Sequence, residues 1–318
     1  MPLAAEYADS VNRRMERLMP VLTPFGVMLG FFLPGAFIHL RPFVPWLFGL
    51  ITLTGALKLR AAEFGNTLRS PVPILAFFAS THILMPLCAM LSASVFAGGD
   101  PNITAGFILL FSGPAAVSSF MWVAMFWGDR ALCLTLILLD TLLAPLVVPG
   151  TVSLLMGTNV AMDVAGIAVS LILMVVIPTI IGVAINESSR GRIPLLLCPY
   201  LNPFSKICLM LVIAANTSPV AKMIRFDDPV VLKVMIVCVF LSAGGFVLSK
   251  LAAAAVRCNP EKTVTLFFSG GLRNISAVTT IAVTFFPEAA AVPALLGIVF
   301  QQTISAIMGK LLIKNPRH

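Results

Sequence analysis

Two ionisable residues lie in apolar surroundings and are the first candidates for chemistry. Arg273 interrupts the stretch TVTLFFSGGLRNISAVTTIAVTFF, and Asp140 lies near the centre of CLTLILLDTLLAPL. A charged group inside a bilayer costs at least about 2.5 to 3.5 kcal/mol, so such a group usually has a partner and a function. Two interpretations stay open. Either the residues form a structural ion pair, or Asp140 exchanges a proton while Arg273 holds an anionic substrate.

Several polar side chains without fixed charge accompany Arg273. Because amides and hydroxyls can orient a small polar ligand, we expect the substrate-binding residues to be Ser119, Arg273, Asn274, Gln301 and Gln302. Thr81 and His82 lie in FFASTHILMP, where a lone histidine is more typical of a hydrogen-bonded interior residue than of a proton relay. The six cysteines form no CxxC motif or Cys/His cluster, so we expect no disulfide, metal site or other cofactor.

All of these residues must be positioned inside a membrane. Apolar residues make up 59% and charged residues 11% of the 318 residues, and the mean hydropathy is +1.01. This composition is typical of an integral membrane protein and not of a soluble domain. Ten apolar runs can cross a hydrocarbon layer of about 30 Å, at about residues 18–39, 43–59, 72–98, 103–126, 131–157, 160–186, 199–219, 229–256, 263–286 and 290–313.

Lysine and arginine predict how these spans are oriented. The basic residues at the termini and in every second connection are Arg13, Arg14, Arg17, Lys58, Arg60, Arg69, Arg130, Arg190, Arg192, Lys206, Lys250, Arg257, Lys262, Lys310, Lys314 and Arg317. The alternate side has only Arg41, Lys222, Arg225 and Lys233. Since basic loops stay in the cytoplasm, we expect both termini to be cytoplasmic. The net charge of +8 then reflects topology and not nucleic-acid binding.

The fourth span of each half shares a sequence pattern. FSGPAAVSS at 111–119 aligns with FSGGLRNIS at 268–276, and GDPNITAGFILL corresponds loosely to CNPEKTVTLF upstream. Each half has five spans, an odd number, so the second copy must cross the membrane in the opposite sense. Inverted repeats of this kind are typical of secondary transporters. We therefore predict one five-helix repeat over 1–157 and a second, inverted one over 158–318.

Glycine and proline fall at the centre of both matching spans, as Gly113-Pro114 and Gly270-Gly271. Proline removes a backbone donor and glycine weakens a helix, so neither span should be one continuous helix. Unwound backbone survives in a membrane only where protein buries it or where it lines a wet cavity. A single Gly-Pro would be an ordinary kink, but paired breaks containing Ser, Asn and Arg predict two interruptions that face each other.

Longer segments carry a resemblance to a known family. VPWLFGLITLTGALKLRAAEF (44–64), GFILLFSGPAAVSSF with GDRALCLTLILLDTLLAPLVVPG, and EKTVTLFFSGGLRNISAVTT with VPALLGIVFQQTISA are similar to the bile acid:sodium symporter family. The resemblance implies an all-α polytopic fold of ten transmembrane helices in two inverted five-helix repeats. It implies a panel domain of helices 1, 2, 6 and 7, a core domain of helices 3–5 and 8–10, and broken helices 4 and 9 that cross. Bacterial members that resemble this chain lie in the inner membrane and move organic acids such as bile salts or pantoate-like compounds.

The family's sodium ligands are replaced in this sequence. The resemblance implies one site formed by the positions of Ser119, Phe120, Cys133, Ile137 and Ser269, and a second formed by those of Ser269, Arg273 and Thr81. Of the first set only Ser119 still suits sodium. A hard cation requires oxygen ligands, which Phe, Ile and Cys lack, and Arg273 would repel it. Asn274 matches a substrate-facing Asn of the family and is retained.

From these substitutions we expect the Arg273 guanidinium to supply permanently the positive charge that sodium supplies in relatives. Transport of a small organic anion would then proceed without sodium, by facilitated diffusion or with a proton carried through Asp140. No nucleic-acid partner or obligate protein partner is expected beside the anion and the lipid bilayer.

Other classes of protein remain as alternatives. One is a conventional sodium symporter with relocated ligands, and another is a non-transporting membrane receptor for a metabolite. An intramembrane enzyme is disfavoured because there is no Gly-x-Gly-Asp, no His-Glu-x-x-His and no second intramembrane carboxylate to pair with Asp140. An arsenite-type efflux carrier is disfavoured because the fourth span contains no cysteine.

Overall fold

The chain is helical in the part that the computed structural model describes, which comprises residues 3–59, 67, 71–96, 99–157, 160, 162–225 and 227–313. Among those residues, seven helices are long and apolar enough to cross a membrane: Pro34–Ala56, Pro71–Phe96, Arg130–Met156, Val164–Ser188, Arg192–Thr217, Pro229–Ala255 and Glu288–Leu312. The prediction of an all-helical protein with multiple membrane spans is confirmed.

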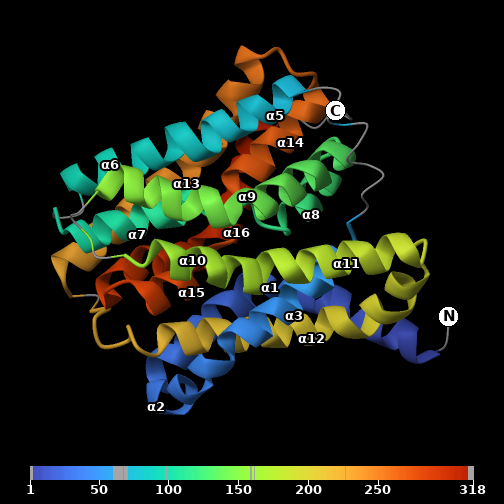
Figure 1. Cartoon of the computed structure of the whole chain (residues 1–318), viewed down its shortest axis with the longest axis horizontal. Coiled ribbons are helices and arrows are strands. Elements are labelled where there is room, and N and C mark those ends of the chain that lie inside the picture. The colour runs from blue at the N-terminus through green and yellow to red at the C-terminus, as the bar shows by residue number, and fades with distance from the viewer. Residues whose placement is uncertain are drawn as a thin grey trace. The chain divides into compact units, whose positions relative to one another are not determined.

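The fourth and ninth expected spans are each split into two shorter helices (Figure 1). The fourth consists of α7 (Pro101–Ser112) and α8 (Ser119–Met125), and the ninth of α14 (Pro260–Gly271) and α15 (Ile275–Phe285). The interruptions occur at the glycine and proline residues that the sequence singled out. These spans are therefore too short, taken helix by helix, to count among the seven full-length helices.

Two compact units of the chain interleave in sequence. The first comprises Met1–Ala61 and Val169–Lys222, and the second comprises Ala62–Ala168 and Met223–His318. This division groups residues by contact, whereas the predicted halves 1–157 and 158–318 are related by symmetry, so the inverted repeat stays a prediction. The predicted orientation also stays a prediction, since Arg60, Arg69, Lys314 and Arg317 lie outside the described residues.

The first unit is built from helices that pack along one another. α1 contacts α12, and α3 contacts both α11 and α12. A break near the N-terminus has a clear cause, because Leu33 precedes Pro34, whose ring disfavours helical geometry at the residue before it, and Leu33 has a φ of −124°. The elements are α1 (Leu3–Phe32), α2 (Pro34–Phe37), the 3₁₀ helix η1 (Ile38–Phe43), α3 (Val44–Ala56), the π-helix η3 (Ile172–Val176), α11 (Ile177–Ser188) and α12 (Arg192–Thr217).

The second unit contains both interrupted spans. α13 packs against α14, α16 and α6, while α7 packs against α6, α9 and η4. Besides the four half-helices, its elements are α5 (Pro71–Phe78), the π-helix η2 (Ala79–Leu84), α6 (Met85–Phe96), α9 (Arg130–Met156), α13 (Pro229–Ala255), the 3₁₀ helix η4 (Glu288–Ala291) and α16 (Val292–Leu312). The division between the two units falls within helix α10 (Val164–Leu171): its residues 164–168 belong to the second unit and its residues 169–171 to the first.

The two half-helices that lead into the interruptions begin in the same way. Asp100 caps α7 by accepting a hydrogen bond from the Asn102 amide at 2.7 Å. Asn259 caps α14 by accepting one from the Lys262 amide at 2.9 Å. In both helices a proline, Pro101 or Pro260, occupies the first turn, where its missing N–H has no intrahelical role. The sequence thus defines two matching short helices that end at the interruptions.

Gly106 in α7 provides a test of how closely the second unit is packed. A Cβ atom there would overlap the Ala290 carbonyl oxygen in η4, and overpacking a rigid backbone contact costs about 1 to 3 kcal/mol. Gly106→Ala should therefore lower the thermal midpoint of the detergent-solubilised protein. Gly150→Ala in α9 is the matched control, because a Cβ atom at Gly150 would meet none of the described residues within 4 Å and alanine favours a helix. Equal midpoints for the two variants would contradict the packing described here.

Candidate functional site

The two interrupted spans meet through their unwound backbone. Ala115 and Arg273 form an isolated antiparallel bridge. The Ala116 amide donates to the Leu272 carbonyl oxygen at 3.0 Å, and the Asn274 amide donates to the Pro114 carbonyl oxygen at 2.8 Å. Each break thus supplies the hydrogen-bond partners that the other lost by leaving helical geometry, as apolar surroundings require. We refer to residues 113–118 and 272–274 together as the crossover.

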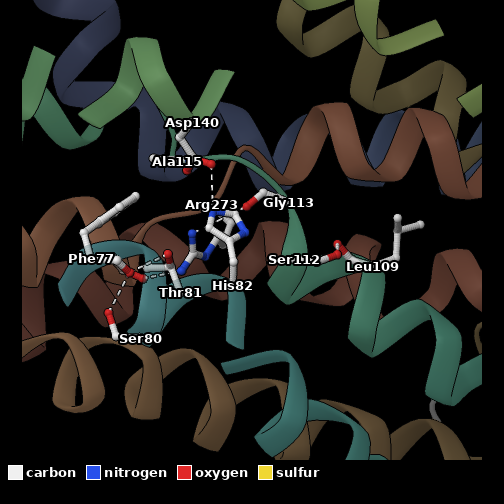
Figure 2. A network of polar contacts seen from close by, with 11 residues as sticks. Phe77, Ser80, Thr81, His82, Leu109, Ser112, Gly113, Ala115, Asp140 and Arg273 are labelled. Carbon is white, nitrogen blue, oxygen red and sulfur yellow. Dashed lines mark hydrogen bonds and ion pairs between the residues drawn. The ribbon is translucent and has the colours of Figure 1, made fainter. Parts of the chain in front are cut away.

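Arg273 is buried in the crossover, with 3% of its surface exposed. Its guanidinium donates to the Gly270 carbonyl oxygen at 2.8 Å and makes a longer contact of 3.5 Å with the Gly113 carbonyl oxygen (Figure 2). The Arg273 carbonyl oxygen accepts a hydrogen bond from the side-chain amide of Gln301 at 2.7 Å. One cation therefore binds carbonyl oxygens from both interrupted spans.

Asp140, on α9, is fully buried and forms a hydrogen bond with the crossover. Its Oδ2 accepts from the Ala115 amide at 2.7 Å, and its Oδ1 lies 2.7 Å from His82 Nε2 (Figure 2). The sequence-based interpretation paired Asp140 with Arg273. In the structure the closest partners of the carboxylate are His82 and Ala115, while Arg273 interacts with Asp140 electrostatically.

Three of the residues at the family's sodium-ligand positions, Ser119, Cys133 and Ser269, form a short chain of contacts. The Cys133 thiol lies 3.4 Å from the Ser269 hydroxyl and 3.8 Å from the Ser119 hydroxyl. Cys133 and Ile137 belong to a buried apolar cluster, against which Phe120 packs. A thiol between two hydroxyls offers few of the oxygen ligands that an alkali ion requires, so these residues do not fit a bound sodium ion.

The residues at the second set of sodium-ligand positions make different contacts. The Thr81 hydroxyl donates to the Phe77 carbonyl oxygen at 2.7 Å, and Arg273 contributes a fixed cation that donates to the Gly270 carbonyl oxygen, next in sequence to Ser269. Within the described residues there is no group of three or more His, Cys, Asp or Glu side chains that could hold a metal ion.

The remaining predicted binding residues are only partly brought together. Gln301 joins Arg273, but the Gln302 side chain accepts from the Trp122 indole at 3.1 Å. The Asn274 side chain caps α15 by accepting from the Ala277 amide at 3.4 Å. Their assignment to the substrate stays a prediction. Sequence reasoning missed the contact between His82 and Asp140, because a separation of 58 positions in the sequence leaves no local pattern. The one available signal was that an intramembrane carboxylate requires a partner.

The chain is a multi-span helical protein, and its two interrupted spans meet next to the glycines within those spans. This architecture is typical of secondary transporters. The model of the Sodium Bile acid symporter family matches residues 45–225, more than half of the chain. The chain belongs to this family, and it is a membrane transporter of the bile acid:sodium symporter type.

Curated relatives extend the similarity over most of the chain. The uncharacterised protein YbaS of Bacillus subtilis is 38% identical over 294 residues, covering 92% of this chain and 96% of YbaS. The probable chloroplastic sodium/metabolite cotransporter BASS3 of Arabidopsis thaliana is 25% identical, covering 96% of this chain and 69% of that protein. The uncharacterised sodium-dependent transporter YocS of Bacillus subtilis is 23% identical, covering 84% and 81%.

Asp140→Asn should damage the second unit strongly. Asparagine has only one side-chain oxygen, so it cannot accept from His82 and from the Ala115 amide on two separate oxygens as Asp140 does. It also leaves the Arg273 charge uncompensated. Breaking a buried charge pair on one side costs about 3 to 5 kcal/mol, so the thermal midpoint should fall markedly. Asp227→Asn is the control, because Asp227 is exposed and bonds Arg225 at the surface. An Asp140→Asn protein as stable as the control would contradict this role.

Proposed function

We propose that the chain transports a small organic anion by alternating access and that its transport is not coupled to sodium. The observation that carries the proposal is the Arg273 guanidinium bound to the Gly113 and Gly270 carbonyl oxygens. Backbone carbonyls at interrupted helices are groups that commonly coordinate sodium in transporters. Here a covalently attached cation takes that place, so no mobile cation is needed to complete the crossover.

The replaced ligand positions support the same proposal from a second direction. Cys133, Ile137 and Phe120 contribute to apolar packing, and a sodium ion entering there would lose its hydration without gaining enough oxygen ligands. The alternative is a sodium symporter with relocated ligands. The names of the relatives favour it, because BASS3 is called a probable sodium/metabolite cotransporter and YocS a sodium-dependent transporter.

The proposed substrate is a bile-acid-like or pantoate-like organic anion. The crossover contains a fixed cation and the Asn274 amide, the Gln301 side chain bonds it from α16, and amides can orient an anion without adding charge. We place the protein in the inner membrane of a bacterium, with both termini in the cytoplasm, on the basis of its basic loops. Its partners would be the substrate and the lipid bilayer. Either facilitated diffusion or proton coupling would be compatible with the absence of a sodium requirement.

Flux into proteoliposomes tests the proposed function directly. Radiolabelled pantoate and taurocholate would be supplied with either sodium or choline outside, at equal ionic strength. We expect uptake of at least one anion at rates that differ by less than about twofold between the two cations. Uptake that rises severalfold with sodium would support the relocated-ligand symporter instead. Binding of an anion without flux would support a receptor.

Substitutions of Arg273 test whether its charge holds the crossover together. Arg273→Gln removes the cation and should lower both the thermal midpoint and the flux, the latter by at least about tenfold, which corresponds to about 1.4 kcal/mol. Arg273→Lys is the matched control because it keeps a charge on a flexible stem, and it should retain more stability than Arg273→Gln. Normal stability and normal flux in Arg273→Gln would overturn the assignment.

A further inference from the structure

Among the residues that the structure describes, one ring nitrogen of His82 is buried without a hydrogen-bond partner. The side chains of His82 and Asp140 are 6% and 0% exposed. Since a carboxylate only accepts hydrogen bonds, the hydrogen between them is carried by Nε2 of the histidine. The other nitrogen, Nδ1, then carries a lone pair in place of a hydrogen, and among the described residues it has no partner. Buried polar atoms are rarely left unpaired, so Nδ1 points to a group that joins it in another state.

The surroundings of His82 suit a ring that gains a positive charge. The Phe78 ring stacks on His82 with centroids 5.4 Å apart, and the Phe77 ring meets it edge-on at 6.4 Å. Aromatic faces attract cations. His82 lies in the π-helix η2, a rare element that is frequent at functional sites. Figure 2 shows His82, Asp140 and Arg273 at the crossover, with a dashed line joining the first two.

Few other titratable groups belong to the elements that pack against η2, which are α5, α6, α7 and α13. α5 and α7 contain none. α6 contributes Cys88. α13 contributes Lys233 near its start, Lys250 near its end, and Cys238, whose thiol donates to the Pro293 carbonyl oxygen. Asp140 and Arg273 are therefore the charged groups that govern protonation of His82.

The charges in this network couple a proton to an anion. The negative Asp140 and the positive Arg273 cancel while His82 is neutral. A proton on Nδ1 adds a buried positive charge, which apolar surroundings oppose. A monovalent anion adds a buried negative charge, which they also oppose. When both enter together the charges cancel again, and the new Nδ1–H can donate to an oxygen of the anion. Each therefore favours binding of the other.

We propose that His82 carries the coupling proton, so that one proton and one monovalent organic anion cross the membrane together without net charge. The proton binds the Nδ1 lone pair from water on the side where the anion enters, and it returns to water on the side where the anion leaves. The hydrogen bond from Nε2 to Asp140 stays intact. Asp140 is thus a positioning residue, tied to the crossover by the Ala115 amide. This inference rests on the proposed function and specifies its coupling ion.

Accumulation of pantoate and taurocholate in sodium-free proteoliposomes tests the coupling. With the membrane potential clamped at zero by potassium and valinomycin, a pH gradient of about one unit should drive about tenfold accumulation of the transported anion. Imposing a potential at equal pH should drive none, because the cycle moves no net charge. Accumulation driven by the potential, or indifferent to the pH gradient, would overturn the coupling.

His82→Gln separates coupling from folding. Glutamine can still donate a hydrogen bond to Asp140, but it cannot take up a proton near neutral pH. The variant should keep the thermal midpoint of the native protein within a few degrees, while its affinity for pantoate no longer changes with pH and pH-driven accumulation falls from about tenfold to none. His39→Gln is the matched control, since His39 is exposed and lies in the first unit. Full pH-driven accumulation by His82→Gln would overturn the proposal.

A spectroscopic measurement reads the proton without relying on flux. Protein with ¹⁵N-labelled histidine in nanodiscs should give a His82 signal, assigned by its loss in His82→Gln, that changes from neutral to charged imidazole when saturating pantoate is added at constant pH. A ring that stays neutral with pantoate bound would overturn the proposal.

Failure of this inference is distinguishable from failure of the proposed function. Flux that is independent of sodium and also independent of pH would leave an anion carrier that works by facilitated diffusion. Sodium-driven accumulation would instead reject the proposed function, whatever the titration of His82.

Discussion

The structure of the second unit depends on one constraint, which is that backbone groups released from a helix inside a membrane must find other partners. The breaks after Ser112 and Gly271 each release amides and carbonyl oxygens. Hydrogen bonds between the two breaks join Ala116 with Leu272 and Asn274 with Pro114. Side chains supply the rest, because Asp140 accepts from the Ala115 amide, Arg273 donates to the Gly270 carbonyl oxygen and Gln301 donates to the Arg273 carbonyl oxygen. Removing either interruption would therefore leave the other unsatisfied.

Charge at the crossover follows from the same constraint. Carbonyl oxygens of Gly113 and Gly270, one from each interrupted span, both contact the Arg273 guanidinium, whose positive charge compensates the negative ends of their dipoles. Arg273 is a permanent part of the chain, so in the proposed function this cation never has to bind or leave. Burying that charge requires a counter-charge, and Asp140 provides one through the electrostatic interaction between them. His82 bonds Asp140, so a structural requirement brings a titratable ring to the centre of the unit.

Composition, the apolar runs and the positions of glycine and proline predicted much of this arrangement but not its details. The apolar runs predicted the membrane helices, and Gly113-Pro114 with Gly270-Gly271 predicted both interruptions, since local sequence decides where a helix ends. The partners of Asp140 could not be predicted, because they depend on how α9 packs against η2 and the crossover. The first expected span was placed at 18–39, yet α1 begins at Leu3. Polar residues there continue a helix whose boundary hydropathy alone does not mark.

The glycines that interrupt the ninth span also determine how closely its neighbours approach. A Cβ atom at Gly270 would overlap the Ser249 side chain of α13, and one at Gly271 would overlap the Phe246 ring. At Gly113 the overlap would be with Val278 of α15. The same three positions therefore weaken the helices and allow the close packing that buries Arg273. Because both effects require the smallest side chain, the buried cation, its carbonyl partners and the interrupted helices form one interdependent arrangement.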